Sequence, residues 1–151
     1  MSEPPSGIAR IFSGVPEFRG IVWRGAAFQL WGPLQLTAPL PTSKDPRVAS
    51  ENFRSPYLHA IVACRGRDIS ALSGHPTEEE VVLLAGAVLT PVTAACRVEG
   101  HAVQVLREVG DHDDIIAPSH ADLAPVLARA RTAVPVPVTS PHRFYSGSAL
   151  R

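Results

Sequence analysis

The stretch that decides the fold is Ser73-Gly74-His75-Pro76-Thr77-Glu78-Glu79-Glu80-Val81-Val82-Leu83-Leu84, in which three consecutive glutamates precede an apolar run. The apolar run is typical of a buried strand, and the glycine and proline before it mark a loop. A solvated acidic loop is one interpretation. If the strand instead extends back through the glutamates, its period of two predicts that Glu78 and Glu80 share one side while Glu79 points away. Such a carboxylate pair could handle charge and protons in a cleft.

Length and charge restrict the classes of function. The 151 residues suffice for one domain with a buried core, and 14 basic residues balance 14 acidic ones. Because the formal net charge is zero, no overall electrostatic attraction draws the chain to nucleic acid or to a membrane surface, and we expect neither as a partner. We divide the chain into an irregular lead-in (1–17), a core (18–110) and a C-terminal helix with an extended tail that packs on the core (111–151).

The location of the protein is constrained by what the sequence lacks. The N-terminus is polar and rich in proline, without a cleavable signal, and no window is apolar enough to span a membrane. We therefore expect a soluble protein, cytoplasmic or secreted without a cleaved signal peptide, with a monomer favoured. Cys64 and Cys96 each lie in an apolar run and are expected to be buried free thiols.

An arginine follows an early apolar run. Residues 21–23 read as a buried strand, and Arg24-Gly25 come directly after it, with a glycine that lets another group approach the backbone closely. The alternative is that Arg24 makes a surface ion pair at the strand edge.

The remaining pattern is that of an α+β fold, predominantly β. Asp45-Pro46 is a helix-start signal, which predicts a helix over 46–54 and places Thr42 and Ser43 on the turn before it. The other expected elements are an extended segment at 34–40, strands at 58–64, 81–84, 88–95 and 102–106 with a loop at 65–77, a helix at 119–132 and an extended tail at 134–141.

Two local features invite a metal or ligand site. His59 lies in an otherwise apolar strand and is better interpreted as a core histidine than as a ligand. Asp111-His112-Asp113-Asp114 is a local acidic run next to a glycine, and we interpret it as a solvated turn. The sequence thus predicts no metal site.

Three motifs together resemble the arginine-serine-glutamate class of mono-ADP-ribosyltransferases, which includes many bacterial toxins. The strand arginine is Val22-Trp23-Arg24-Gly25. The Ser-Thr-Ser turn corresponds to Pro41-Thr42-Ser43-Lys44-Asp45-Pro46-Arg47-Val48-Ala49, with Phe53 at the usual aromatic position. The Glu-x-Glu motif is Glu78-Glu79-Glu80-Val81-Val82-Leu83-Leu84, followed by Gly86. Their order and spacing cover about residues 18–110.

The resemblance implies an ADP-ribosyltransferase-like fold, with small mixed or antiparallel sheets around an NAD cleft and few helices. It implies that NAD is cleaved, without a metal, and that ADP-ribose passes to a protein acceptor, with arginine indicated by the second glutamate. An inhibitor protein is a further possible partner. The resemblance implies that Glu80 stabilises the ribose and that Glu78 orients or deprotonates the acceptor. Arg24 would bind the diphosphate, the Gly25 backbone would admit the nicotinamide amide, and Phe53 would stack on nicotinamide. Thr42 or Ser43 would orient the catalytic glutamate.

The chain departs from the family pattern at two places. Pro41 stands where the family has its first serine, and proline has no hydroxyl with which to orient the glutamate. The helical portion that usually precedes the arginine strand is missing from the residues before Arg24. Two interpretations are open: the C-terminal helix covers the exposed sheet face instead, or the chain is an excised or minimal domain. Two other functions remain open: an NAD glycohydrolase that delivers only water, and a catalytically silent binding module of this fold.

Overall fold

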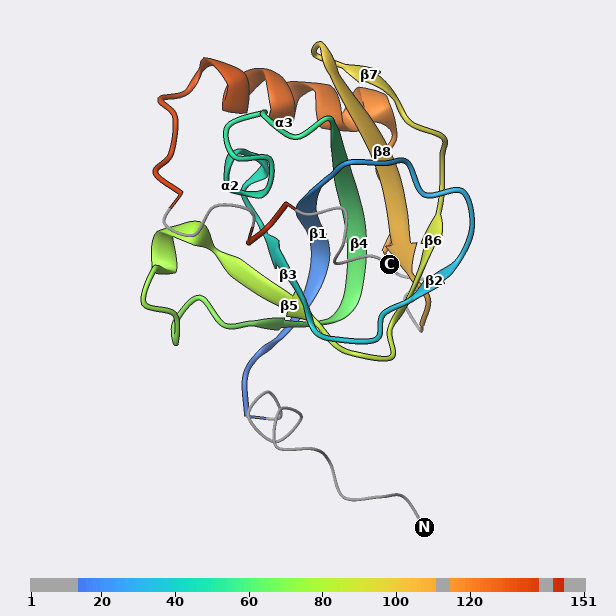
Figure 1. Cartoon of the computed structure of the whole chain (residues 1–151), viewed down its shortest axis with the longest axis vertical. Helices are drawn as coiled ribbons and strands as arrows, with labels where there is room; N and C mark the ends of the chain where they lie inside the picture. The colour runs from blue at the N-terminus through green and yellow to red at the C-terminus, as the bar shows by residue number, and fades with distance from the viewer. Residues whose placement is uncertain (1–13, 111–114, 139–142, 146–151) are drawn as a thin grey trace.

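The computed structural model describes residues 14–110, 115–138 and 143–145 (Figure 1). The acidic run 111–114 lies outside the described residues. Along the described chain the elements are β1 (Glu17–Ala26), β2 (Leu34–Gln35), β3 (Leu40–Ser43), α2 (Pro46–Ala49), β4 (Tyr57–Asp68), the 3₁₀ turn η1 (Pro76–Glu78), β5 (Glu80–Leu83), β6 (Val88–Pro91), β7 (Cys96–Val98), β8 (His101–Glu108) and α3 (His120–Thr132). The predicted α+β class, mostly strand with few helices, is confirmed.

The strands of the described residues form one eight-stranded sheet with the order β1-β3-β5-β4-β8-β6-β2, and β7 pairs with β8. β1 also pairs with β4, so β1, β3, β5 and β4 pair in a closed circuit. The β4–β8 pairing is parallel, and the other pairings are antiparallel. This circuit places the strands that carry the predicted site residues side by side.

Alternating side chains divide the core into two clusters on opposite faces of the sheet. Val22 and Leu83 belong to the first cluster, whereas Trp23 and Leu127 belong to the second. Helix α3 packs against β7 and α2 and contributes Leu127 to the second cluster, as Figure 1 shows at the top of the view. Helix α3 therefore contributes to the core on this face of the sheet.

Helix α3 also begins where the sequence predicts. Ser119 is its N-cap and forms a capping box with Asp122, in which each side chain accepts a hydrogen bond from the other residue's backbone N–H. Leu123 and Leu127 are buried, whereas Val126 is exposed. Among the described residues, no helix is both long enough and apolar enough to cross a membrane.

The helix predicted over 46–54 is too long, because α2 ends at Ala49. The Ser50 hydroxyl donates to the Pro46 carbonyl at 2.6 Å and accepts from the Phe53 N–H at 2.8 Å, which closes the helix locally. Glu51, Asn52 and Phe53 then adopt positive φ angles of 52°, 60° and 67°. This left-handed run turns the chain back toward β4.

Strand boundaries differ from the prediction where tertiary pairing decides them. β4 runs on to Asp68 instead of ending at Cys64, because Arg67 pairs with both Glu17 of β1 and Val82 of β5. The segment 34–40 divides into β2 and the start of β3, and the strand predicted over 88–95 ends at Pro91. Both cysteines are free thiols; Cys64 is buried as predicted, but Cys96 is exposed.

Candidate active site

The three motifs meet across β1, β3 and β5. Ser43 of β3 lies directly opposite Trp23 of β1, the residue before Arg24, and it also lies opposite Glu80 of β5. Residues separated by 37 positions along the chain, Ser43 and Glu80, are thus neighbours in the sheet because β3 and β5 are antiparallel.

Arg24 is a buried residue and not a surface ion pair. Only 1% of it is exposed. Its Nη1 donates to the Pro41 carbonyl at 2.8 Å and to the Arg143 carbonyl at 3.2 Å. Burial lowers the pKa of Arg24 to about 10, which leaves the guanidinium charged at neutral pH. A buried positive charge held by carbonyl oxygens is suited to an anionic ligand.

The glutamates do not form the extended strand entrance that the sequence suggested. Pro76–Glu78 is a 3₁₀ turn, Glu79 is left-handed with φ 48°, and β5 begins only at Glu80. Even so, Glu78 and Glu80 are 4% and 3% exposed, while Glu79 is exposed to solvent. The burial pattern expected from a period of two is therefore present, but a turn produces it.

The hydroxyls of Thr42 and Ser43 hold the acidic segment by its backbone. Both residues lie on β3 and not on the predicted turn. Thr42 donates to the Val81 carbonyl and Ser43 donates to the Glu78 carbonyl, each at 2.6 Å. Because a hydroxyl has one proton to donate, neither residue also donates to the Glu80 carboxylate in this structure, which is the contact that the resemblance implied for one of them.

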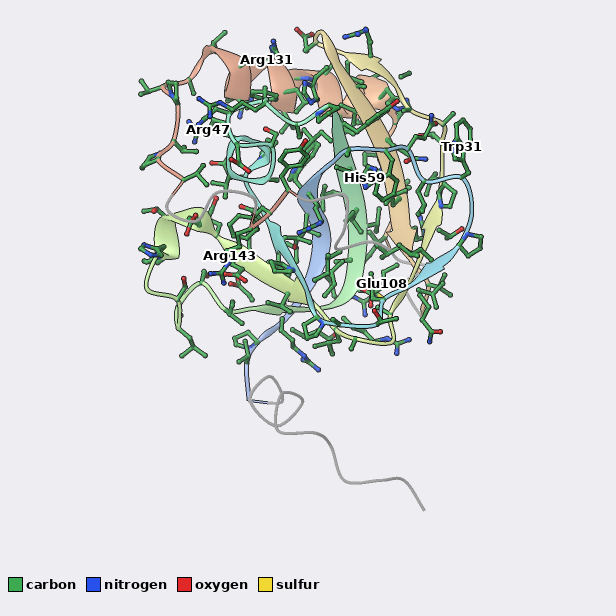
Figure 2. All side chains as sticks on the ribbon, viewed as in Figure 1. Trp31, Arg47, His59, Glu108, Arg131 and Arg143 are labelled. Atoms are coloured by element: carbon green, nitrogen blue, oxygen red, sulfur yellow. The ribbon has the colours of Figure 1, made fainter. Side chains whose placement is uncertain are left out.

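A C-terminal segment, Arg143–Tyr145, lies in the same site, and sequence reasoning missed it. Arg143 Nη2 donates to Glu80 Oε1, and the Gly25 N–H donates to the Phe144 carbonyl at 2.9 Å. Gly25 and Tyr145 form a parallel bridge. Figure 1 shows this short dark red segment beside β1 and β3, and Figure 2 shows Arg143 next to β5. The adjacent aromatic residues in the C-terminal tail were the available signal.

Gly25 is required for this approach. A Cβ atom at Gly25 would lie 2.6 Å from the Ala49 carbonyl oxygen and 2.9 Å from the Tyr145 Cβ atom. Sequence reasoning predicted a close approach to the Gly25 backbone, and the structure shows it with protein groups.

Phe53 lies away from these residues. Its ring meets the His101 ring edge-on at a centroid distance of 5.6 Å, and the Arg131 guanidinium lies over it at 4.8 Å. Its neighbours thus come from β8 and α3, at the top of Figure 2, where Arg131 is labelled. A stacking role for Phe53 stays a prediction.

His59 is a buried core residue. It lies opposite Arg24 on β4, and its Nε2 forms a 3.0 Å hydrogen bond with the Phe28 carbonyl. Because this carbonyl can only accept, Nε2 carries the proton. Burial lowers the pKa of His59 to about 4, so the ring is neutral at pH 7.

Comparison with solved structures shows the fold of the ADP-ribosyltransferases. The ADP-ribosyltransferase HopU1 of Pseudomonas syringae pv. tomato is 26% identical with a TM-score of 0.54, over 62% of this chain and 46% of that one. Exoenzyme S from Pseudomonas aeruginosa is 19% identical with a TM-score of 0.56, over 73% and 60%. Plx2a, an ADP-ribosyltransferase toxin from Paenibacillus larvae, is 13% identical with a TM-score of 0.51, over 64% of each chain.

The likeness spans about half to two thirds of each of these solved chains. No protein-family model matches the sequence, and no curated protein sequence matches it.

Proposed function

From the ADP-ribosyltransferase fold and its buried acidic site, we propose that this chain is a mono-ADP-ribosyltransferase that cleaves NAD and transfers ADP-ribose to a protein arginine. The observation that carries the proposal is the arrangement of two buried opposite charges. Arg24 and Glu80 lie on strands joined through β3, and both contact Arg143. A cationic and an anionic group within reach of one short segment match a substrate with an anionic diphosphate and a ribose that becomes cationic.

The chemistry assigned to Glu80 is electrostatic. When the bond between C1′ of the ribose and the nicotinamide nitrogen breaks, its electron pair leaves with nicotinamide, and positive charge develops on the sugar. A buried carboxylate stabilises that charge more than an exposed one does, since little water screens it. Glu80 is 3% exposed and opens β5, so its position is fixed by the sheet.

The acceptor completes the reaction. A guanidinium nitrogen of the acceptor forms the new bond to C1′ and loses one proton, which we assign to Glu78. Glu78 is buried, and its backbone carbonyl accepts a hydrogen bond from the Ser43 hydroxyl. The guanidinium of Arg143 already lies on Glu80, which supports an arginine side chain as a group that this site accommodates.

The remaining roles concern binding. Arg24 is proposed to hold the diphosphate of NAD, and the Gly25 backbone to bind the nicotinamide amide. Thr42 and Ser43 fix the backbone of the acidic segment and are proposed as positioning residues. Exoenzyme S was solved with carba-NAD bound, which supports a nicotinamide dinucleotide as the substrate of this fold. No metal is part of the proposal.

The test is nicotinamide release from NAD, measured with and without an arginine analogue. Glu80→Gln keeps the size of the side chain and removes its charge, so release should fall more than tenfold in a protein that remains folded, whereas the exposed Glu79→Gln should keep the wild-type rate. Release that is independent of the analogue would indicate a glycohydrolase. Retention of more than about a tenth of the rate in Glu80→Gln would contradict the role of Glu80.

A further inference from the structure

We infer that the segment Arg143–Tyr145 is an autoinhibitory occupant of the NAD cleft, which must leave before NAD binds. The inference rests on the proposed function, because it concerns the groups assigned there to NAD. The Arg143–Tyr145 segment of the same chain is bound to those groups and therefore competes with NAD.

The segment uses the same groups as the proposed substrate. The Arg24 guanidinium, assigned to the diphosphate, donates to the Arg143 carbonyl. The Gly25 N–H, assigned to the nicotinamide amide, donates to the Phe144 carbonyl. The Glu80 carboxylate, assigned to the ribose, is paired with the Arg143 guanidinium. A backbone N–H serves one acceptor at a time, and the volume beside Gly25 is filled by Tyr145, so the segment and NAD exclude each other.

The contacts also explain why the segment stays in place. Phe144 is 1% exposed and belongs to the core cluster that contains Trp23 and Leu127. The segment belongs to the same chain, so its local concentration at the cleft is that of an intramolecular ligand, on the order of millimolar or higher. A short peptide bound in this way competes effectively even when its intrinsic affinity is modest.

The same contacts show how the segment could leave. The sheet circuit β1-β3-β5-β4 is closed without it, and the described segment contributes a single bridge to β1. The Arg143 side chain is 39% exposed, whereas its partner Glu80 is 3% exposed. Arg143 is therefore the contact that solvent, NAD or a partner reaches first, and its loss leaves the strands paired.

The test uses the full chain and the variant Arg143→Gln, which removes the guanidinium and keeps a polar side chain of similar reach. Arg54→Gln is the matched control, since Arg54 is an exposed arginine in the turn before β4. Calorimetry with NAD measures the dissociation constant. If the segment occupies the cleft about 90% of the time, its complete release should tighten apparent NAD binding about tenfold. Arg54→Gln should bind NAD like the wild type.

A second measurement follows the segment without using NAD chemistry. Chymotrypsin cleaves after Phe144 only when this buried ring is accessible, and mass spectrometry detects the loss of residues 145–151. We expect faster cleavage in Arg143→Gln than in the wild type and in Arg54→Gln, and faster cleavage of the wild type when NAD is added. Melting temperatures establish that all three proteins remain folded.

The outcomes separate this inference from the proposed function. If NAD binds with the same dissociation constant to the wild type and to Arg143→Gln, the inference is wrong and the proposed function stands. Equal cleavage at Phe144 in the two proteins would also overturn it. If none of the three proteins binds NAD, the proposed function fails, and the competition inferred here fails with it.

Discussion

The Ser43 hydroxyl donates a hydrogen bond to the backbone carbonyl of Glu78 at 2.6 Å, and not to the side chain of either glutamate. The same oxygen accepts from the Asp45 N–H at 3.0 Å. One buried hydroxyl therefore joins the end of the 3₁₀ turn that carries Glu78 to the start of α2. Where the family resemblance implied a serine that orients a carboxylate, this chain fixes the backbone that carries the carboxylates.

Removing this hydroxyl should lower stability. Ser43→Ala leaves the Glu78 carbonyl and the Asp45 N–H without their partner in a buried place, which costs about 1–3 kcal/mol of the free energy of unfolding. Urea denaturation measures the change. Ser73→Ala is the control, because the Ser73 hydroxyl accepts from the His75 N–H in an exposed turn and its loss should stay within about 0.5 kcal/mol. Equal effects of the two substitutions would contradict the anchoring role.

Arg24→Lys should weaken NAD binding although the charge is kept. An ammonium is a point charge that cannot reproduce the planar fork of a guanidinium, and Arg24 already bonds to two carbonyls from different segments. We expect the dissociation constant of NAD to rise about tenfold or more, measured in the Arg143→Gln background so that the C-terminal segment competes less. Arg19→Lys, at an exposed position of β1, should leave it unchanged. The opposite result would mean that Arg19 is the diphosphate-binding arginine.

Asn52 should contribute to stability through a contact 84 residues away. Its side-chain amide donates to the Val136 carbonyl and accepts from the Val136 N–H, both at 2.9 Å, and its φ of 60° is one that asparagine tolerates well. Asn52→Ala should cost about 1–3 kcal/mol by thermal or urea unfolding. Asn52→Gly adopts the positive φ without strain but also lacks the hydrogen bonds to Val136, so its stability should lie between that of the wild type and that of Asn52→Ala. A glycine variant as stable as the wild type would show that the amide contacts contribute nothing.

His59 should make stability fall in acid. Its pKa is about 4 in the folded protein and about 6.5 in the unfolded chain. Between these values the unfolded chain binds more protons, so stability is full above pH 6.5 and decreases as the pH falls toward 4, by on the order of 3 kcal/mol. Unfolding of the wild type and of His59→Gln at pH 7.5 and pH 4.5 should show a smaller decrease in the variant. Identical decreases would place the acid sensitivity elsewhere.

The sequence predicted the parts of the site that local pattern encodes. A pattern of a few residues was enough to predict three features: Arg24 after an apolar run, the glutamates before β5, and the capped helix α3. The end of α2 was not predicted, because a Ser50 hydroxyl contact closes the helix and a left-handed turn at 51–53 follows, in which the Asn52 side chain contacts Val136. The place of Arg143–Tyr145 depends entirely on tertiary contacts with β1 and β5. The adjacent aromatic residues of the tail indicate that it packs somewhere, but they do not indicate where.

The two buried glutamates should differ in what they support. Glu80 begins β5, where the sheet fixes its backbone, while Glu78 ends the 3₁₀ turn two residues earlier along the chain, and the left-handed Glu79 between them is exposed to solvent. We therefore expect Glu78→Gln to lower transfer to an arginine analogue about tenfold or more while most NAD hydrolysis remains. The reason is that a guanidinium acceptor must lose a proton to a nearby base, and water depends less on a second carboxylate as that base. Glu79→Gln is the matched control and should change neither rate.

Both rates are measured as nicotinamide release and as labelled ADP-ribose on the analogue, in the Arg143→Gln background. Glutamine keeps the length of each side chain, so a change in the ratio of transfer to hydrolysis reports the lost charge rather than a lost fold, and melting temperatures check this directly. If Glu78→Gln and Glu80→Gln lose both activities to the same degree, the two carboxylates act as one hydrolytic unit. In that case the acceptor role of Glu78 is wrong, and the burial of Glu78 must be explained by its support of Glu80.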